Sequence, residues 1–137
     1  MGLKEKKAAR DFEQDRLDSL KAQIFEAAKF EFEIEIKWDT ITIDGYSHLY
    51  EQTWPLIYFE PVIIALKELC SDDFCQEAVQ ADLKKMVIEN DGDIHNSSKC
   101  ASYSDGVLTI NHSPIINAEN QVQDRAKTIK EVIENAL

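Results

Sequence analysis

The chain has 137 residues, with 26 Asp or Glu against 15 Lys or Arg and a formal net charge of −11. This length fits one domain over residues 1–137 and is enough to bury a hydrophobic core without a metal or a disulfide. A surface this acidic repels phosphate backbones, so we expect no nucleic acid to bind the folded body and expect a basic protein as the partner.

The N-terminus is charged and lacks the apolar run of a secretory signal. The longest apolar run, residues 62–66, is far shorter than the ~20 residues that span a bilayer. The three cysteines are an odd number, so they cannot form a complete set of disulfides within one chain. We therefore expect a cytoplasmic protein that makes no contact with a membrane.

Residues 4–29 have the apolar spacing of one amphipathic helix, with Leu17, Leu20 and Ile24 at three- and four-residue steps. From residue 30 the period changes to two, as in a strand with one solvated face. Ile41 and Ile43 either continue this strand or form a short second one. The solvated face carries a row of three acidic residues, here called the glutamate row: Glu31, Glu33 and Glu35.

The middle of the chain is expected to be helical, with one helix over about 47–54 and another starting near Pro61. Pro55 has no backbone N–H donor, so it should separate these two helices. Residues 71–73 predict the start of a further helix that runs to about Ala81 and buries Phe74.

The last third predicts a strand over 83–88, a polar loop over 90–98 and a hairpin. The arms of the hairpin, 99–104 and 107–112, are joined by Asp105-Gly106, a strong turn signal. A final helix is expected over about 118–136, with Asn117 as its cap.

Strands that occur in blocks, with a hairpin among them, indicate an α+β fold. We expect a mainly antiparallel sheet of about four to five strands, packed by long N- and C-terminal helices and a central helical segment. The start at residues 2–6, the Asp-Gly-Val-Leu-Thr-Ile hairpin (residues 105–110) and the terminal Asp-Arg-Ala-Lys helix (residues 124–127) resemble those of small bacterial proteins to which no activity is assigned. The resemblance implies no site.

Four aromatic residues at four-residue spacing would form a stripe on one helix, here called the aromatic stripe: Tyr46, Tyr50, Trp54 and Tyr58. Such a stripe either packs against the sheet as core or lines a ligand pocket or partner groove. In a pocket, His48 would supply the polar group.

Other candidate sites are weaker. Cys70, Cys75, His95 and Cys100 lack the paired spacing of a structural zinc site, and residues 89–93 fail the pattern of a calcium loop. No glycine-rich phosphate loop or nucleophile elbow is present in the sequence. We therefore expect neither a metal site nor a cofactor, and the sequence leans away from an enzyme.

Three hypotheses for function remain. The first is a protein-binding domain that meets a basic partner through its acidic surface, as an inhibitor, immunity protein or adaptor would. The second is a small enzyme or ligand-binding protein with an aromatic pocket between helix and sheet. The third is a self-associating structural subunit, such as a homodimer.

Overall fold

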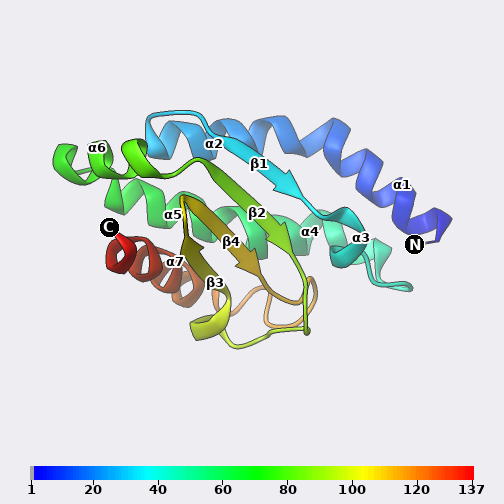
Figure 1. The fold of residues 1–137 in the computed structure, drawn as a ribbon. Coiled ribbons are helices and arrows are strands. Elements are labelled where there is room, and N and C mark those ends of the chain that lie inside the picture. Colours follow the sequence, from blue (N-terminus) through cyan, green and yellow to red (C-terminus); the bar gives the residue numbers. More distant parts are fainter. Residues whose placement is uncertain (1) are drawn as a thin grey trace.

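The computed structural model describes residues 2–137 and contains one mixed four-stranded sheet (Figure 1). β1 and β4 both run parallel to β2, and β3 runs antiparallel to β4. In spatial order the strands are β1 (Glu33–Ile36), β2 (Lys85–Glu89), β4 (Val107–Asn111) and β3 (Ala101–Ser104).

The α+β class is confirmed, but the expected mainly antiparallel sheet is wrong. After β1 the chain passes through a series of helices that return it to the starting end of the sheet, and a crossover of this kind makes the next strand parallel. Only the hairpin of β3 and β4 is antiparallel. The periodicity of single strands does not reveal how they pair.

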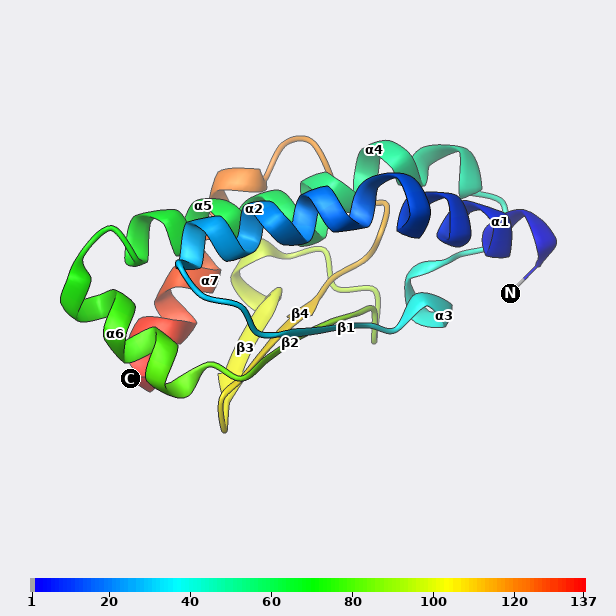
Figure 2. The same ribbon diagram turned by 90° about the horizontal axis from the view of Figure 1, so that it is seen from above.

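The long helices lie on one face of the sheet, and the other face has no helix over it (Figure 2). On the covered face, the side chains of the two central strands have no measurable exposure and join the helices in one hydrophobic core. These side chains are Met86, Ile88, Leu108 and Ile110. The open face carries mostly polar side chains, together with Val87 and Val107.

The N-terminal helix runs, as predicted, from α1 (Leu3–Phe12) through a π-helical turn (Glu13–Leu17) into α2 (Asp18–Ala28). A π turn holds more residues than an α turn. The apolar step from Phe12 to Leu17 is correspondingly five residues instead of four, and both side chains reach the core. The helix ends at Lys29, which takes a left-handed φ of 66°.

The first α-helix of the central segment ends at Trp54 and the next starts at Glu60, close to the predicted bounds, but the chain between them stays helical as a π-helical turn. Proline has no N–H to bind the carbonyl oxygen of Glu51, four residues before it. The guanidinium of Arg16 donates to that oxygen over 3.3 Å instead. The segment comprises a 3-10 turn (Ser47–Leu49), α4 (Tyr50–Trp54), a π-helical turn (Pro55–Phe59) and α5 (Glu60–Leu69).

Residues 38–41 form a short helix, α3 (Trp38–Ile41), so the predicted extension of the first strand is wrong. Thr40 and Thr42 both donate their hydroxyl protons to carbonyl oxygens of this turn, at 2.7 and 2.8 Å. Ile41 turns inward and is 2% exposed. Burial of one isoleucine and local hydroxyl bonds thus outweigh the β propensity of this stretch.

The helix predicted after residue 72 is present as α6 (Asp73–Asp82), and the side chain of Asp72 accepts a hydrogen bond from the N–H of Cys75. The predicted burial of Phe74 is wrong, since its side chain is 80% exposed. α6 lies at one end of the helix layer (Figures 1 and 2), and only Val79 of α6 is buried.

The hairpin is confirmed, with Asp105 and Gly106 both at positive φ, 54° and 77°, as a tight two-residue turn requires. The last helix, α7 (Val122–Ala136), starts four residues later than predicted. Asn117 is not its cap: it has a φ of 59°, and its side-chain amide donates to the oxygen of His95.

Candidate functional site

The aromatic stripe belongs to the core along most of its length. Tyr50, Trp54 and Tyr58 are at most 1% exposed, and only Tyr46 is open to solvent, at 43%. The ring of Tyr50 stacks on that of Trp54, with centroids 4.4 Å apart. His48 is exposed beside them.

The polar atoms of the stripe are bound within the chain. Trp54 donates its indole N–H to the oxygen of Ile41 over 3.2 Å, and Tyr58 donates its hydroxyl to the oxygen of His112 over 2.6 Å. Burial raises the pKa of the Tyr58 hydroxyl well above its ordinary value. These side chains tie the central helix to the loops around it and present no free group to a ligand.

A groove of about 390 Å³ lies between α1 and residues 47–51, and Tyr50 and His48 are among its lining residues. Some of its charged residues pair with one another, whereas Lys4 and Asp15 take part in no ion pair within residues 2–137. Lys7 lies 3.1 Å from Asp11, and the Arg16 guanidinium lies 3.7 Å from the Glu51 carboxylate. Of the four stripe residues, only Tyr50 lines this groove, while Trp54 and Tyr58 are buried in the core.

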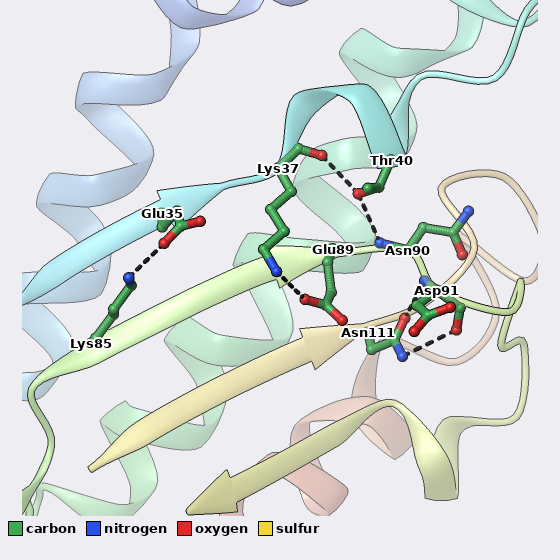
Figure 3. A network of polar contacts seen from close by, with 8 residues as sticks. All are labelled: Glu35, Lys37, Thr40, Lys85, Glu89, Asn90, Asp91 and Asn111. Atoms are coloured by element: carbon green, nitrogen blue, oxygen red, sulfur yellow. Dashed lines mark hydrogen bonds and ion pairs between the residues drawn. The ribbon is translucent and has the colours of Figure 1, made fainter. Parts of the chain in front are cut away.

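The glutamate row follows β1. Glu33 and Glu35 lie on the open face of the sheet, and Glu31 precedes the strand and is exposed. Lys85 of β2 lies between the two strand glutamates, with its Nζ 3.1 Å from Glu33 Oε2 and 2.5 Å from Glu35 Oε1 (Figure 3 shows the Glu35 contact). The parallel register, which sets Glu33 beside Lys85, brings these charges together.

These contacts do not neutralise the row, which has three carboxylates and, within residues 2–137, one lysine in contact with it. The hydrogen bond from Lys85 lowers the pKa of Glu35, and the two glutamates raise the pKa of Lys85. Lys85 contacts two of the three carboxylates, and the charge of Lys37 also acts on Glu35. The side chains of Glu33 and Glu35 remain 66% and 42% exposed, so their charge is available to a partner.

Further along the same face, Lys37 and Glu89 form a second ion pair, at 3.1 Å (Figure 3). The Lys37 side chain is 46% exposed, whereas that of Glu89 is 19% exposed. The bond to Glu89 raises the pKa of Lys37. This pair balances its own charge and leaves the glutamate row as the charged feature of β1.

The exits of the strands are linked by side-chain bonds that the sequence did not reveal (Figure 3). The hydroxyl of Thr40 accepts from the N–H of Asn90 over 3.1 Å. Asn111 accepts from the N–H of Asp91 at 2.7 Å and donates to its oxygen at 3.2 Å. The sequence feature that corresponds to these bonds is the run of polar residues after the second strand, which by itself predicts only a loop. These bonds hold β1, β2 and β4 in register at that end.

The cysteines and histidines do not converge on a reactive centre. Within residues 2–137 there is no group of three or more His, Cys, Asp or Glu side chains placed to hold a metal ion. Cys70 and Cys100 are buried, and burial raises the pKa of the Cys100 thiol to about 11. His112 is fully buried, and its Nδ1 lies 2.6 Å from the oxygen of Ser113.

The fold therefore defines a two-layer domain with one open, polar sheet face and a charged edge strand. Comparison with protein families, with curated proteins and with solved structures finds no match to this chain. Over the residues that the structure describes, no helix combines the length and the apolar character needed to cross a bilayer.

Proposed function

We propose that this protein is a binding domain that recognises a basic protein through the glutamate row. The observation that carries the proposal is the placement of Glu33 and Glu35 on an exposed edge strand, where Lys85 is the one cation in ion-pair contact with them within residues 2–137. The three glutamates of the row outnumber this cation, and no helix lies over the open face that carries Glu33 and Glu35 (Figure 2). Such a patch attracts cationic partners and speeds their association at low salt.

The ion pairs give this surface a fixed geometry. The ion pairs with Lys85 restrict the conformations of the Glu33 and Glu35 side chains, so less side-chain entropy is lost when a partner binds. The bonds among Thr40, Asn90 and Asn111 fix the strands beneath. A preorganised charged surface favours specificity for one partner over unselective attraction.

The ligand-binding alternative has less support. Three of the four stripe residues belong to the core, and two ion pairs occupy part of the groove beside His48. Self-association also has no specific observation in its favour. The binding of a basic protein is the function that the open, acidic side of the sheet fits best.

The test is a capture experiment with three forms of the protein. The first is wild type, the second carries E31K, E33K and E35K, and the third is a charge-matched control with E77K, E131K and E134K on α6 and α7. The control residues are exposed and take part in none of the ion pairs found in residues 2–137.

Each form is incubated with native lysate at low and then at high salt, and bound proteins are identified by mass spectrometry. We expect a basic protein that binds wild type and the control, leaves at high salt, and fails to bind the row variant. Equal capture by all three forms would refute the proposal, because the position of the charges would then be irrelevant.

A further inference from the structure

The outer edge of β1 has main-chain groups without partners. β1 is at one end of the strand order and pairs only with β2. The N–H of Glu33 donates to Lys84 and that of Lys37 donates to Ile88, at 3.3 and 3.0 Å. Alternate residues of a strand point their main-chain groups to opposite sides.

The N–H and carbonyl groups of Ile34 and Ile36 consequently point away from the sheet. No backbone or side-chain hydrogen bond within residues 2–137 occupies them. Figure 2, which looks at the molecule from above, shows β1 as the nearest strand with no other element drawn over it. The edge is therefore open to a further strand in the plane of the sheet.

The apolar side of β1 is also incompletely covered. Ile34 and Ile36 face the helix layer but remain partly exposed, whereas their neighbours Met86 and Ile88 on β2 are fully buried. Next to them lies a partly buried aromatic cluster in which the ring centroids of successive pairs are 5.2 and 5.3 Å apart. Its members are Phe25, Phe30 and Phe32. A fifth strand with apolar side chains on this side would cover the exposed area.

The negative charge of Glu33 and Glu35 on the open face of β1 determines which kind of strand can be added beside it. A strand added beside β1 places its side chains directly opposite Glu33 and Glu35 on the open face, where opposite charges stabilise the pair and like charges destabilise it. In an antiparallel pairing of two copies, Glu33 of one copy would face Glu35 of the other. A second copy of this chain is therefore disfavoured, and a basic segment is favoured.

We infer that β1 is a site of strand addition for an extended segment of another protein in which Lys or Arg alternates with aliphatic residues. The basic residues meet the glutamate row on the open face, and the aliphatic residues pack against Ile34 and Ile36 on the other. Main-chain bonds give affinity and the alternating side chains give specificity, as in other cases of strand addition. This inference rests on the proposed function and specifies how the basic partner binds.

The probe is a capped heptapeptide in which four lysines alternate with three valines, together with two N-methylated forms of equal charge that are isomers of each other. One isomer carries main-chain N-methyl groups on the three valines, and the other carries them on three of the lysines. In antiparallel addition a residue opposite Ile34 exchanges both main-chain bonds with it, so valine amides face β1 and lysine amides face solvent. Affinities are measured by calorimetry at low salt, and amide exchange of Ile34 and Ile36 by NMR.

We expect the parent peptide and the lysine-methylated isomer to bind equally, and the valine-methylated isomer to bind about tenfold more weakly or worse. Binding should also slow the exchange of the Ile34 and Ile36 amides. Selective loss in the lysine-methylated isomer would indicate parallel addition at the same edge.

Two outcomes separate this inference from the proposed function. If all three peptides bind equally and the E31K, E33K and E35K variant binds none, the acidic recognition stands and strand addition is refuted. If the parent peptide does not bind wild type, both are refuted. A peptide with glutamate in place of lysine serves as the charge control and should not bind.

Discussion

The buried guanidinium of Arg125 on α7 donates a hydrogen bond to the main-chain oxygen of Leu56, over 3.1 Å. Leu56 lies in the π-helical turn, where the N–H of Glu60 is used by the Pro55 oxygen and the next residue in register, Pro61, has no N–H. Arg125 thus supplies the donor that the second proline cannot. Arg16 does the same for the carbonyl of Glu51 before the first proline.

Arg125 also donates to the oxygens of Asn117 and Ala118, at 2.8 and 2.7 Å. Replacement by methionine, R125M, leaves three carbonyl groups without this donor, and we expect the free energy of unfolding to fall by about 2–4 kcal/mol. Urea denaturation monitored by circular dichroism measures it. The control K127M, at an exposed position of the same helix, should change it by less than about 0.5 kcal/mol. Equal effects of the two variants would contradict the role of Arg125.

Trp54 is a second test of the core. It is fully buried and contacts the rings of Tyr50, Phe12 and Trp38. We expect W54A to lower the free energy of unfolding by about 3–5 kcal/mol, as large-to-small changes at buried aromatic positions do. Y46A, at the exposed end of the aromatic stripe, is the comparison and should cost less than about 1 kcal/mol. A small loss in W54A would mean that the stripe is not core.

On α6, the smaller apolar residue Val79 should contribute more to stability than the larger Phe74, because Val79 is buried and Phe74 is exposed. F74S should leave the free energy of unfolding within about 0.5 kcal/mol of wild type, because the ring is 80% exposed. V79A should lower it by about 1–2 kcal/mol, since Val79 is 1% exposed. Thermal denaturation of the two variants measures the difference. A larger loss of stability in F74S than in V79A would show that the Phe74 ring is covered in solution.

His112 makes stability depend on pH. Burial lowers its pKa below the ordinary 6.5, and the charge of Arg125 acts in the same direction. Below about pH 6.5 the unfolded chain takes up a proton that the folded protein binds more weakly, so stability is full above this pH and falls as the pH falls.

The measurement is the urea midpoint between pH 7.5 and 5.5 for wild type, H112Q and H48Q. H112Q should show a flatter dependence on pH than wild type, whatever its absolute stability. H48Q, at an exposed position, should keep the wild-type slope. An unchanged slope in H112Q would show that another group carries the dependence.

Lys85 restrains the glutamate row, and its removal should strengthen the attraction of a cationic probe. We expect K85M to bind the lysine–valine heptapeptide about two- to tenfold faster than wild type at low salt, with the gain lost at high salt. Stopped-flow fluorescence with a labelled peptide measures the rate. K127M removes the same charge from α7 and should change the rate less. An unchanged or slower association rate in K85M would contradict the expected effect of its charge.

Local features of the fold were predictable from the sequence where a residue's neighbours along the chain decide its state. The period of three to four in residues 4–29, the Asp105-Gly106 turn and the alternating pattern around Glu33 and Glu35 each reflect short-range geometry. Glu33 and Glu35 lie on the solvated face of the first strand as expected, because strand side chains alternate between faces, whereas Glu31 precedes the strand.

Other features depended on groups far apart in the chain. Whether a helix survives Pro55 and Pro61 depends on Arg16 and Arg125, which reach it from other helices. The parallel pairing sets Lys85 between Glu33 and Glu35, and the strand order leaves β1 as an edge. The sequence by itself determined which residues can be helix, strand and turn, whereas the tertiary structure decided which of them meet. The physical reason is that hydrogen bonds, ion pairs and burial between distant segments have no signature in local periodicity.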